Sequence, residues 1–534
     1  MIKLKKICNF RALFFLFLLI MLCIFGATRV YSNKIYLVLL IFPVAYFLYV
    51  GIKRKFVLLG ISFVILCGVS AFSYLTIKNY EEFIVPDGQV VIVATVDKIS
   101  MNSYGNYIYY FRDLEYKQDE SSPTCKIEGN FFMYVDEEST MLEANRFDRI
   151  AFVGKILKNN TNSQNNFYND NKYKVYISNN STPIKIEVDK SLIEQFRENN
   201  LNYLIQTLGE ENGNICYSIL YGDRATVASF ELDNFKQSGV MHLFAVSGLH
   251  VGLLVAVVVW FLSKLKTNGK VQFFLILFFL LGYCILCSFT PSVVRASIMS
   301  ICFLLSKLFE RKYDTLNALS LAGIILLVIS PTMFFTIGFQ LSFLAVFGVI
   351  SLSKILSFVK FKSDFMQEFW NAIKLSVSAQ MGVLPLMFYY FGGVTTWTLL
   401  ANLLLIPFFT LFYTLLFVCN IIVVIIPSFG VILKVPGILF DLFVYFNDLI
   451  ISLPGGYIEY SNVNTLSIVL YMLFLWCGSK YLVVSGRTRA IIVIILVLCI
   501  TCALIMGNLN LFGGDVNISP QNLPLKTILA QKCG

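Results

Sequence analysis

The sequence predicts a polytopic α-helical membrane protein of about ten to thirteen spans that carries a small extracytoplasmic β domain, with an OB-fold as one candidate for that domain. Of its 534 residues, 57% are hydrophobic and 14% are charged, and the mean hydropathy is +0.73. These values exclude a water-soluble globular protein. Apolar runs long enough to cross about 30 Å of hydrocarbon recur between residues 12 and 77 and between residues 243 and 507.

Basic residues give these spans an orientation. Four of them precede the first apolar run: Lys3, Lys5, Lys6 and Arg11. A KRK triplet at 53–55 separates the second and third runs, and further Lys and Arg residues fall in alternate loops. The positive-inside rule therefore predicts a cytoplasmic N-terminus and places the segment after residue 77 on the extracytoplasmic side.

Changes in composition divide the chain into four parts: 1–77 (N-terminal transmembrane helices), 78–198 (the extracytoplasmic β domain), 199–508 (a transmembrane core) and 509–534 (a short extracytoplasmic tail). Stretches such as QVVIVATV and KYKVYIS alternate apolar and polar residues, which is typical of strands. Five or six such strands suit a small closed barrel. Residues 78–198 contain 14 Lys and Arg against 19 Asp and Glu, so this domain is not a broadly basic surface for nucleic acid.

The stretch SGVMHLFAVSGLHVGLL at 238–254 contains both histidines of the chain, His242 and His250. A shared metal ion is disfavoured because eight residues of continuous helix separate them by about 12 Å of rise. A serine hydrolase would use Ser247 and His250 on one helix face, but AVSG lacks the first glycine of the GxSG of rhomboid intramembrane proteases. The favoured interpretation is packing and polar lining, because Ser247 and Gly248 allow close helix approach and a histidine at membrane depth faces a cavity or a partner.

Residues 219–254, ILYGDRATVASFELDNFKQSGVMHLFAVSGLHVGLL, resemble the signature of the ComEC competence family. Five further blocks resemble the same family in the same order: SVVRASIM (292–299), RKYDTLNALSLAG (311–323), SPTMFFTIGFQLSFLAVFGV (330–349), SAQMGVLPLMFYYFGG (378–393) and ANLLLIPF (401–408). The resemblance covers about 215–430 and marks 199–508 as a competence-type core. It implies a channel of the bacterial inner membrane that takes up single-stranded transforming DNA.

Polar residues within these blocks are the candidates for a DNA path or a polar lining: Asp223, Arg224, His242, Ser247, Gly248, His250, Arg295, Gln340, Gln380 and Asn402. Arg295 is the most informative, because a guanidinium within a span costs a few kcal/mol unless it meets water, a partner or phosphate. Asp223 and Arg224 are adjacent, and a plain local ion pair is an equally good interpretation of them. Bonding to a neighbouring helix is the commoner role for the amide side chains.

The resemblance also implies partners. Many family members carry a C-terminal metallo-β-lactamase-like domain thought to act as a nuclease, but no histidine follows His250. We therefore expect no such two-metal site in this chain and a separate nuclease. The chain has no G-x4-GK[ST] phosphate loop, so we expect a cytoplasmic helicase or translocase and an outer DNA receptor. We predict no catalytic residue, metal or cofactor, and a transporter of another solute on the same helices is the alternative function.

Overall fold

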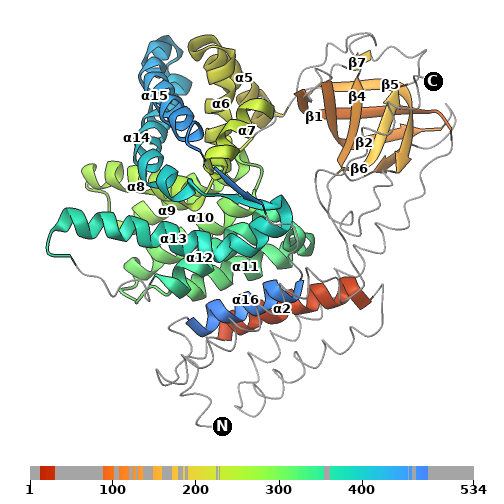
Figure 1. The fold of residues 1–534 in the computed structure, drawn as a ribbon. Coiled ribbons are helices and arrows are strands. Elements are labelled where there is room, and N and C mark those ends of the chain that lie inside the picture. Colours follow the sequence, from red (N-terminus) through yellow and green to blue (C-terminus); the bar gives the residue numbers. More distant parts are fainter. Residues whose placement is uncertain are drawn as a thin grey trace.

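A computed structural model shows the chain as a β barrel beside a larger body of helices (Figure 1). It describes residues 12–30, 88–101, 107–118, 124–127, 130–135, 148–158, 171–177, 184–186, 191–223, 227, 229–353, 361–454, 456–459 and 465–478. Several sequence predictions lie outside these described residues: the spans between 35 and 77 and at 490–507, the tail 509–534 and the candidate residue Arg224.

Among the described residues of the β domain there are seven strands: β1 (Val90–Met101), β2 (Tyr107–Lys117), β3 (Cys125–Ile127), β4 (Asn130–Val135), β5 (Arg149–Lys158), β6 (Asn171–Ile177) and β7 (Ile184–Ile186). Because β1 pairs with both β2 and β5, the strands β1-β2-β4-β6-β5 close into a barrel, and β4–β6 is its parallel pair. The alternation that predicts strands is visible in β1, where Val90 and Ile92 are buried in the barrel core and Val91 is exposed. The structure thus confirms a barrel-like sheet in this domain.

A helix begins just after the barrel, within the last residues of the range 78–198. This helix, α5 (Leu192–Leu208), starts with a capping box at Ser191 and Glu194. The Ser191 hydroxyl accepts a hydrogen bond from the Glu194 N–H at 3.3 Å, and the Glu194 carboxylate accepts one from the Ser191 N–H at 2.9 Å. These bonds satisfy backbone donors that the first turn of a helix leaves free.

Helices form most of the remaining described chain: α2 (Ala12–Val30), α6 (Glu210–Tyr221), α7 (Ser229–Ser238), α8 (Gly248–Lys264), α9 (Gly269–Leu286), α10 (Pro291–Leu308), α11 (Thr315–Ile329), α12 (Ile337–Leu352), α13 (Asp364–Phe391), α14 (Thr398–Ile425), α15 (Lys434–Ile451) and α16 (Thr465–Gly478). Short 3₁₀ turns are η4 (Met241–Phe244), η5 (Pro331–Phe335) and η7 (Pro427–Leu433), and strands β8 (Gly393–Thr395) and β9 (Tyr457–Glu459) pair with each other.

Five helical segments of the described chain are long and apolar enough to cross a membrane: α9, α10, α13, α14 and the continuous segment η7–α15. The helices α8, α11 and α12 are shorter and also apolar. The structure therefore supports membrane character and a helical fold class. The total of about ten to thirteen spans stays a prediction.

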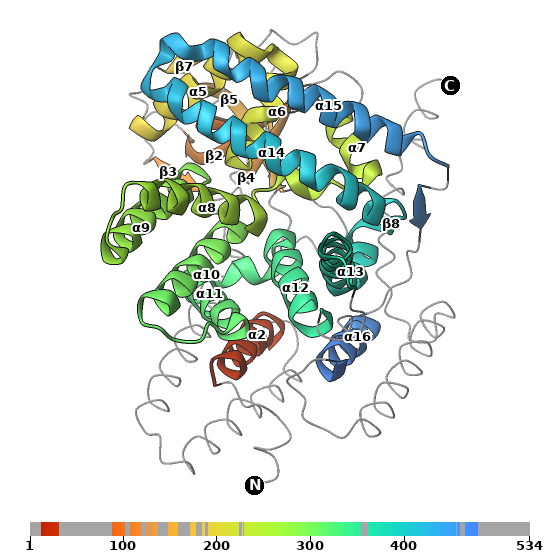
Figure 2. The ribbon, with the colours of Figure 1, turned by 90° about the vertical axis from the view of Figure 1, so that its left-hand side faces the viewer.

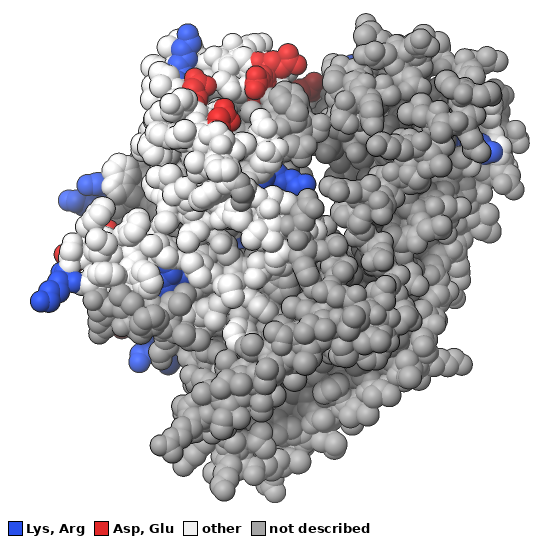
Figure 3. All heavy atoms as spheres, in the orientation of Figure 1, with Lys and Arg blue, Asp and Glu red and all other residues white. Residues whose placement is uncertain are grey.

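Charge alternates between the two sets of helix ends. The α8–α9 and α10–α11 connections and the residues beside them are rich in Lys and Arg, whereas the connections at 287–290, 330–336 and 392–397 contain no charged residue. Most basic side chains on the helical body project from its left-hand edge in Figure 3, and an acidic group lies at the top, over α5 and α6. One set of helix ends is thus basic and the other uncharged, which is the pattern of the positive-inside rule.

Three buried polar residues attach the α5–α6 pair to α14. Asn200 donates to the Asn420 side-chain oxygen at 3.0 Å, and Asn420 donates to the Tyr221 hydroxyl at 3.3 Å. Tyr221 in turn donates to the Asn200 oxygen at 3.3 Å and closes the cycle. Because buried amides require partners, this cycle fixes where α5 and α6 dock.

Five helices form a closed circuit of contacts that we call the five-helix ring. In the order α8, α10, α12, α13, α14, each helix contacts the next, and α14 contacts α8. Figure 2 shows these helices together, with α13 seen almost along its axis. The helices α9 and α11 pack against members of the ring, and α2 packs against α11.

Candidate functional site

Every helix of the five-helix ring contributes at least one candidate residue from the sequence: Ser247 as N-cap with Gly248 and His250 (α8), Arg295 (α10), Gln340 (α12), Gln380 (α13) and Asn402 (α14). The remaining described candidates, Asp223 and His242, precede the ring in the chain. The junctions between neighbouring helices show what each side chain contacts.

His250 lies at the junction of α8 and α14. Its side chain is fully buried, and its ring is nearly perpendicular to those of Phe409 and Tyr413, with centroid distances of 5.1 and 4.5 Å. The Tyr413 hydroxyl lies 3.1 Å from that of Tyr283, which donates to the Leu220 carbonyl oxygen at 2.8 Å. A buried line of polar groups therefore runs from α6 through α9 and α14 to His250.

Ser247 and His250 form the N-terminal cap of α8. The Ser247 hydroxyl accepts a hydrogen bond from the Leu249 N–H at 3.2 Å, and His250 Nδ1 accepts one from the Ser247 N–H at 3.0 Å. In this capping box, histidine occupies the position that Glu or Gln usually takes. The Ser247 Oγ atom lies 2.9 Å from Nδ1, which is also the separation of a nucleophile and its base. The cap, however, already uses Nδ1 as an acceptor, so helix capping explains the geometry.

Arg295 lies where α8, α10 and α12 meet. It is 6% exposed, and its guanidinium carbon lies 6.0 Å from the centre of the Phe343 ring on α12. Its Nη1 atom is 4.0 Å from the Met299 sulfur, and its Nη2 atom would lie 3.4 Å from a Cβ added to Gly248 on α8. No carboxylate in the described part of the chain forms an ion pair with it.

Gln340 connects α12 to α13. Its Oε1 atom accepts a hydrogen bond from the Tyr390 hydroxyl at 2.8 Å, and its Nε2 atom donates to the Phe334 carbonyl oxygen at 3.0 Å. Farther along the same junction, Gly348 of α12 meets Gly382 of α13 so closely that an added Cβ on Gly348 would lie 2.7 Å from the Gly382 Cα.

Asn402 and Gln380 are brought together by Ser376, at the junction of α13 and α14. The Ser376 hydroxyl oxygen accepts from Asn402 Nδ2 at 2.9 Å and from Gln380 Nε2 at 3.2 Å. The Asn402 Oδ1 atom is buried and makes no hydrogen bond within the described chain. Each of these amides therefore bonds a neighbouring side chain.

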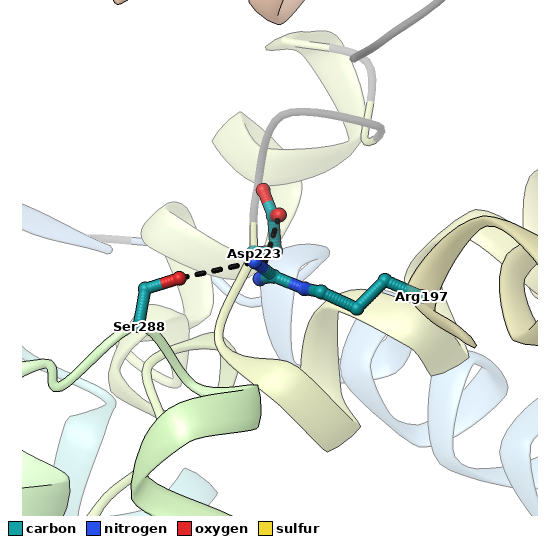
Figure 4. A network of polar contacts seen from close by, with 3 residues as sticks. All are labelled: Arg197, Asp223 and Ser288. Carbon is teal, nitrogen blue, oxygen red and sulfur yellow. Dashed lines mark hydrogen bonds and ion pairs between the residues drawn. The ribbon is translucent and has the colours of Figure 1, made fainter. Parts of the chain in front are cut away.

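Asp223 lies apart from the ring and pairs with Arg197 of α5 (Figure 4). The Arg197 Nη2 atom lies 3.4 Å from Asp223 Oδ2, and its Nη1 atom donates to the Ser288 hydroxyl at 3.0 Å. Burial lowers the pKa of Arg197, but its interactions with Tyr217 and with the Asp223 carboxylate outweigh burial and raise this pKa, so the guanidinium stays charged. The local pairing of Asp223 with Arg224 stays a prediction because Arg224 lies outside the described residues.

The Arg197 network holds a strained turn. Ser288 and Phe289, in the connection from α9 to α10, have φ angles of 52° and 51°, in the left-handed region that non-glycine residues rarely adopt. The bond from Arg197 to Ser288 thus ties α5, which follows the β barrel in the chain, to the turn that leads into α10 and Arg295.

The two histidines occupy different environments. His242 lies in η4 with its side chain exposed, and its Nδ1 atom is 3.2 Å from the Gly239 carbonyl oxygen. His250 is buried at a ring junction, as described above. A shared role for the two rings gains no support from this arrangement.

Several contact residues were not identified from the sequence: Arg197, Ser288, Phe343, Ser376, Tyr390 and Tyr413. One signal was available for Arg197, because the S-L-I-E capping-box pattern at 191–194 predicts a helix start within the range given to the β domain. The others carry no local signal, since their partners are distant in sequence.

Taken together, the structure describes a mostly helical protein of membrane character whose ring helices carry polar side chains at their junctions. The family model of the competence protein matches residues 219–485, which is half of the chain. The chain belongs to the competence protein family, in agreement with the resemblance of its sequence blocks.

Curated relatives agree with this assignment. The chain is 32% identical over 221 residues to ComE operon protein 3 of Bacillus subtilis, which covers 41% of this chain and 28% of the relative. It is 22% identical over 393 residues to recombination protein 2 of Haemophilus influenzae, covering 70% of this chain and 48% of the relative. It is also 29% identical over 217 residues to the uncharacterized protein MG316 of Mycoplasma genitalium, which covers 40% of this chain and 53% of the relative.

The chain therefore spans about a quarter to a half of the length of these relatives. No solved structure matches it significantly.

Proposed function

We propose that this protein takes part in competence DNA uptake and that its five-helix ring forms the path of a single DNA strand across the cytoplasmic membrane. Membership of the competence protein family supports the first part. The observation that carries the second part is the presence of a polar side chain at every junction of the ring: His250 between α8 and α14, Arg295 between α8, α10 and α12, Gln340 between α12 and α13, and Asn402 between α13 and α14.

The ring is closed in this structure, because His250 and Arg295 are buried. Passage of a strand requires neighbouring helices to separate. At a polar junction this separation breaks hydrogen bonds. Each costs only about 0.5–1.5 kcal/mol net, because water or a nucleotide takes the place of the lost partner. An apolar junction has no such replacement and costs about 25 cal/mol for each Å² exposed to water. Polar junctions therefore favour opening to a hydrated strand.

The proposed orientation follows the charge of the helix ends. The basic ends face the cytoplasm, the β barrel and the C-terminal tail are extracytoplasmic, and the N-terminus is cytoplasmic. Each phosphate that moves inward against a negative-inside potential costs about 2.3 kcal/mol per 100 mV. We therefore include three partners in the proposal: a cytoplasmic helicase or translocase, an outer DNA receptor and a separate nuclease.

Deletion of the gene in its own host, followed by complementation, tests the proposal. Fluorescent linear DNA is added to cells, and surface-bound DNA is measured separately from DNA that resists added nuclease. We expect deletion to abolish the protected DNA while leaving surface binding intact, and the wild-type gene to restore protection. Equal protection with and without the gene would contradict the proposal.

Two substitutions examine the ring itself. We expect Gln340→Leu and Asn402→Leu to reduce protected DNA at unchanged protein level, because each removes a polar junction. Gln272→Leu is the matched control. Gln272 lies on α9, which is not a helix of the ring, and its side chain donates to the Thr267 carbonyl oxygen just before α9. Equal uptake in all three variants would remove the ring from the proposed path.

A further inference from the structure

We propose that Arg295 and the first turn of α8 bind a phosphodiester group of the DNA strand. This inference rests on the proposed function and names the chemistry of one site in the five-helix ring. It starts from a positive charge that the described part of the molecule leaves unbalanced.

The Arg295 guanidinium has few partners for its five N–H donors. Its Nη1 atom reaches the Met299 sulfur at 4.0 Å, and the Phe343 ring lies 6.0 Å away. Its Nε atom is buried and makes no hydrogen bond within the described chain. An arginine that is only 6% exposed is normally paired with a carboxylate or a phosphate. The ion pairs of the described residues do not include Arg295.

Two helix N-termini add to this positive charge. The Arg295 Nη2 atom lies beside Gly248, the first residue of α8, and Arg295 itself lies in the second turn of α10. Helix N-termini carry a positive partial charge and attract anions. The Gly248 N–H has no hydrogen-bond acceptor among the described residues. A guanidinium at the positive end of two helices repels both of them, and a bound anion between them removes the repulsion.

The location favours a DNA phosphate over a lipid headgroup. Arg295 faces α8 and α12 within the ring, whereas the part of α10 that carries large exposed apolar side chains, such as Phe303, lies two turns farther along the helix. Gly248 has no side chain, so space remains next to the Nη2 atom. The planar guanidinium can offer two parallel N–H donors to two phosphate oxygens.

The test uses the purified full chain in nanodiscs of phosphatidylcholine, which has no net charge. Fluorescein-labelled oligo(dT) of twenty nucleotides is titrated at several salt concentrations, and binding is followed by anisotropy. We expect Arg295→Gln to weaken binding about tenfold or more and to reduce the slope of log K against log salt by about 0.7, the value for one phosphate contact of a single strand. Arg311→Gln is the matched control, because it removes the same charge from an exposed loop.

Two further variants keep the test independent of folding. Arg295→Lys retains the charge and should keep the salt slope while losing part of the affinity. Gly248→Ala places a methyl group 3.4 Å from Nη2, an ordinary contact distance that α8 should tolerate. We expect this methyl to weaken oligo(dT) binding without lowering the melting temperature. Unchanged affinity and slope in both Arg295→Gln and Gly248→Ala would overturn the site while leaving the uptake result, and hence the proposed function, unaffected.

A second experiment distinguishes a DNA phosphate from the phosphate of a lipid headgroup. Wild-type and Arg295→Gln proteins are melted in nanodiscs with and without phosphatidylglycerol. We expect the same stabilisation by phosphatidylglycerol in both. If only the wild type is stabilised, and oligo(dT) binding does not depend on Arg295, the anion is a lipid headgroup and the DNA assignment is wrong.

Discussion

The crossing of α12 and α13 gives the sharpest prediction about the stability of the five-helix ring. At this crossing Gly348 and Gly382 face each other, and a Cβ on Gly348 would lie 2.7 Å from the Gly382 Cα and still closer to the Ser378 carbonyl oxygen. Both neighbours are helix backbone, so no side-chain rotation relieves the clash. The change Gly348→Ala must therefore push the two helices apart.

The size of the effect follows from these distances. Ordinary contact begins at 3.4 Å, and the closer contact to the Ser378 carbonyl oxygen sets the movement, so α13 must shift by about 1 Å relative to α12. Overpacking of this kind costs about 1–3 kcal/mol. The movement also strains the 2.8 Å bond from Tyr390 to Gln340 at the same junction, worth about 0.5–1.5 kcal/mol. We expect Gly348→Ala to lower the free energy of unfolding by about 2–4 kcal/mol.

The assay is unfolding of the purified chain in mixed micelles with a rising fraction of sodium dodecyl sulfate, followed by circular dichroism and tryptophan fluorescence. Gly338→Ala is the matched control on the same helix, because no atom lies within 4 Å of its added Cβ. That control should be neutral or more stable by up to about 1 kcal/mol, owing to the higher helix propensity of alanine. If Gly348→Ala unfolds at the same detergent fraction as Gly338→Ala, α12 and α13 do not cross at Gly348 and the reasoning fails.

Three further predictions use the same unfolding assay. Gly323→Ala puts a methyl 2.6 Å from the Phe17 Cζ atom, so it should destabilise the docking of α2 by about 1–3 kcal/mol. In the double variant with Phe17→Ala this clash is absent, so the cost of Gly323→Ala should disappear. If the costs of the two single substitutions simply add in the double variant, the contact does not exist. Asn200→Leu and Asn420→Leu should each lower the free energy of unfolding by about 1–3 kcal/mol, because each leaves buried hydrogen-bond partners unpaired. The double variant should lose less than the sum of the two. If all forms are equally stable, the hydrogen-bonded cycle is absent. Ser247→Ala should lower the free energy of unfolding by about 1 kcal/mol, because it removes the N-cap of α8. A fluorophosphonate probe should not label the wild-type protein. Labelling of the wild type that disappears in Ser247→Ala would instead identify a serine hydrolase.

Much of the fold class could be predicted from the sequence, because its signals are local. Apolar runs of the length of a span mark a lipid-embedded helix, and alternation over a few residues marks a strand such as β1. The blocks that resemble the competence family also lie within continuous stretches, and the family model confirms that assignment. The helix α5, which carries Arg197, was not predicted. Its capping box lies at the edge of the β segment, where the hydrophobic pattern changes from the period of a strand to that of a helix.

The composition and order of the chain by themselves determined membrane character, a β barrel ahead of a helical core, and the family. Only the tertiary structure decided which side chains meet: Ser376 with Asn402, Arg197 with Asp223 and Ser288, and Gly348 with Gly382. The physical reason is that a helix in lipid is apolar on nearly every side, so its sequence does not mark the face that contacts a neighbour. Those faces become defined when the helices pack, and the packing brings the isolated charge of Arg295 against the first turn of α8.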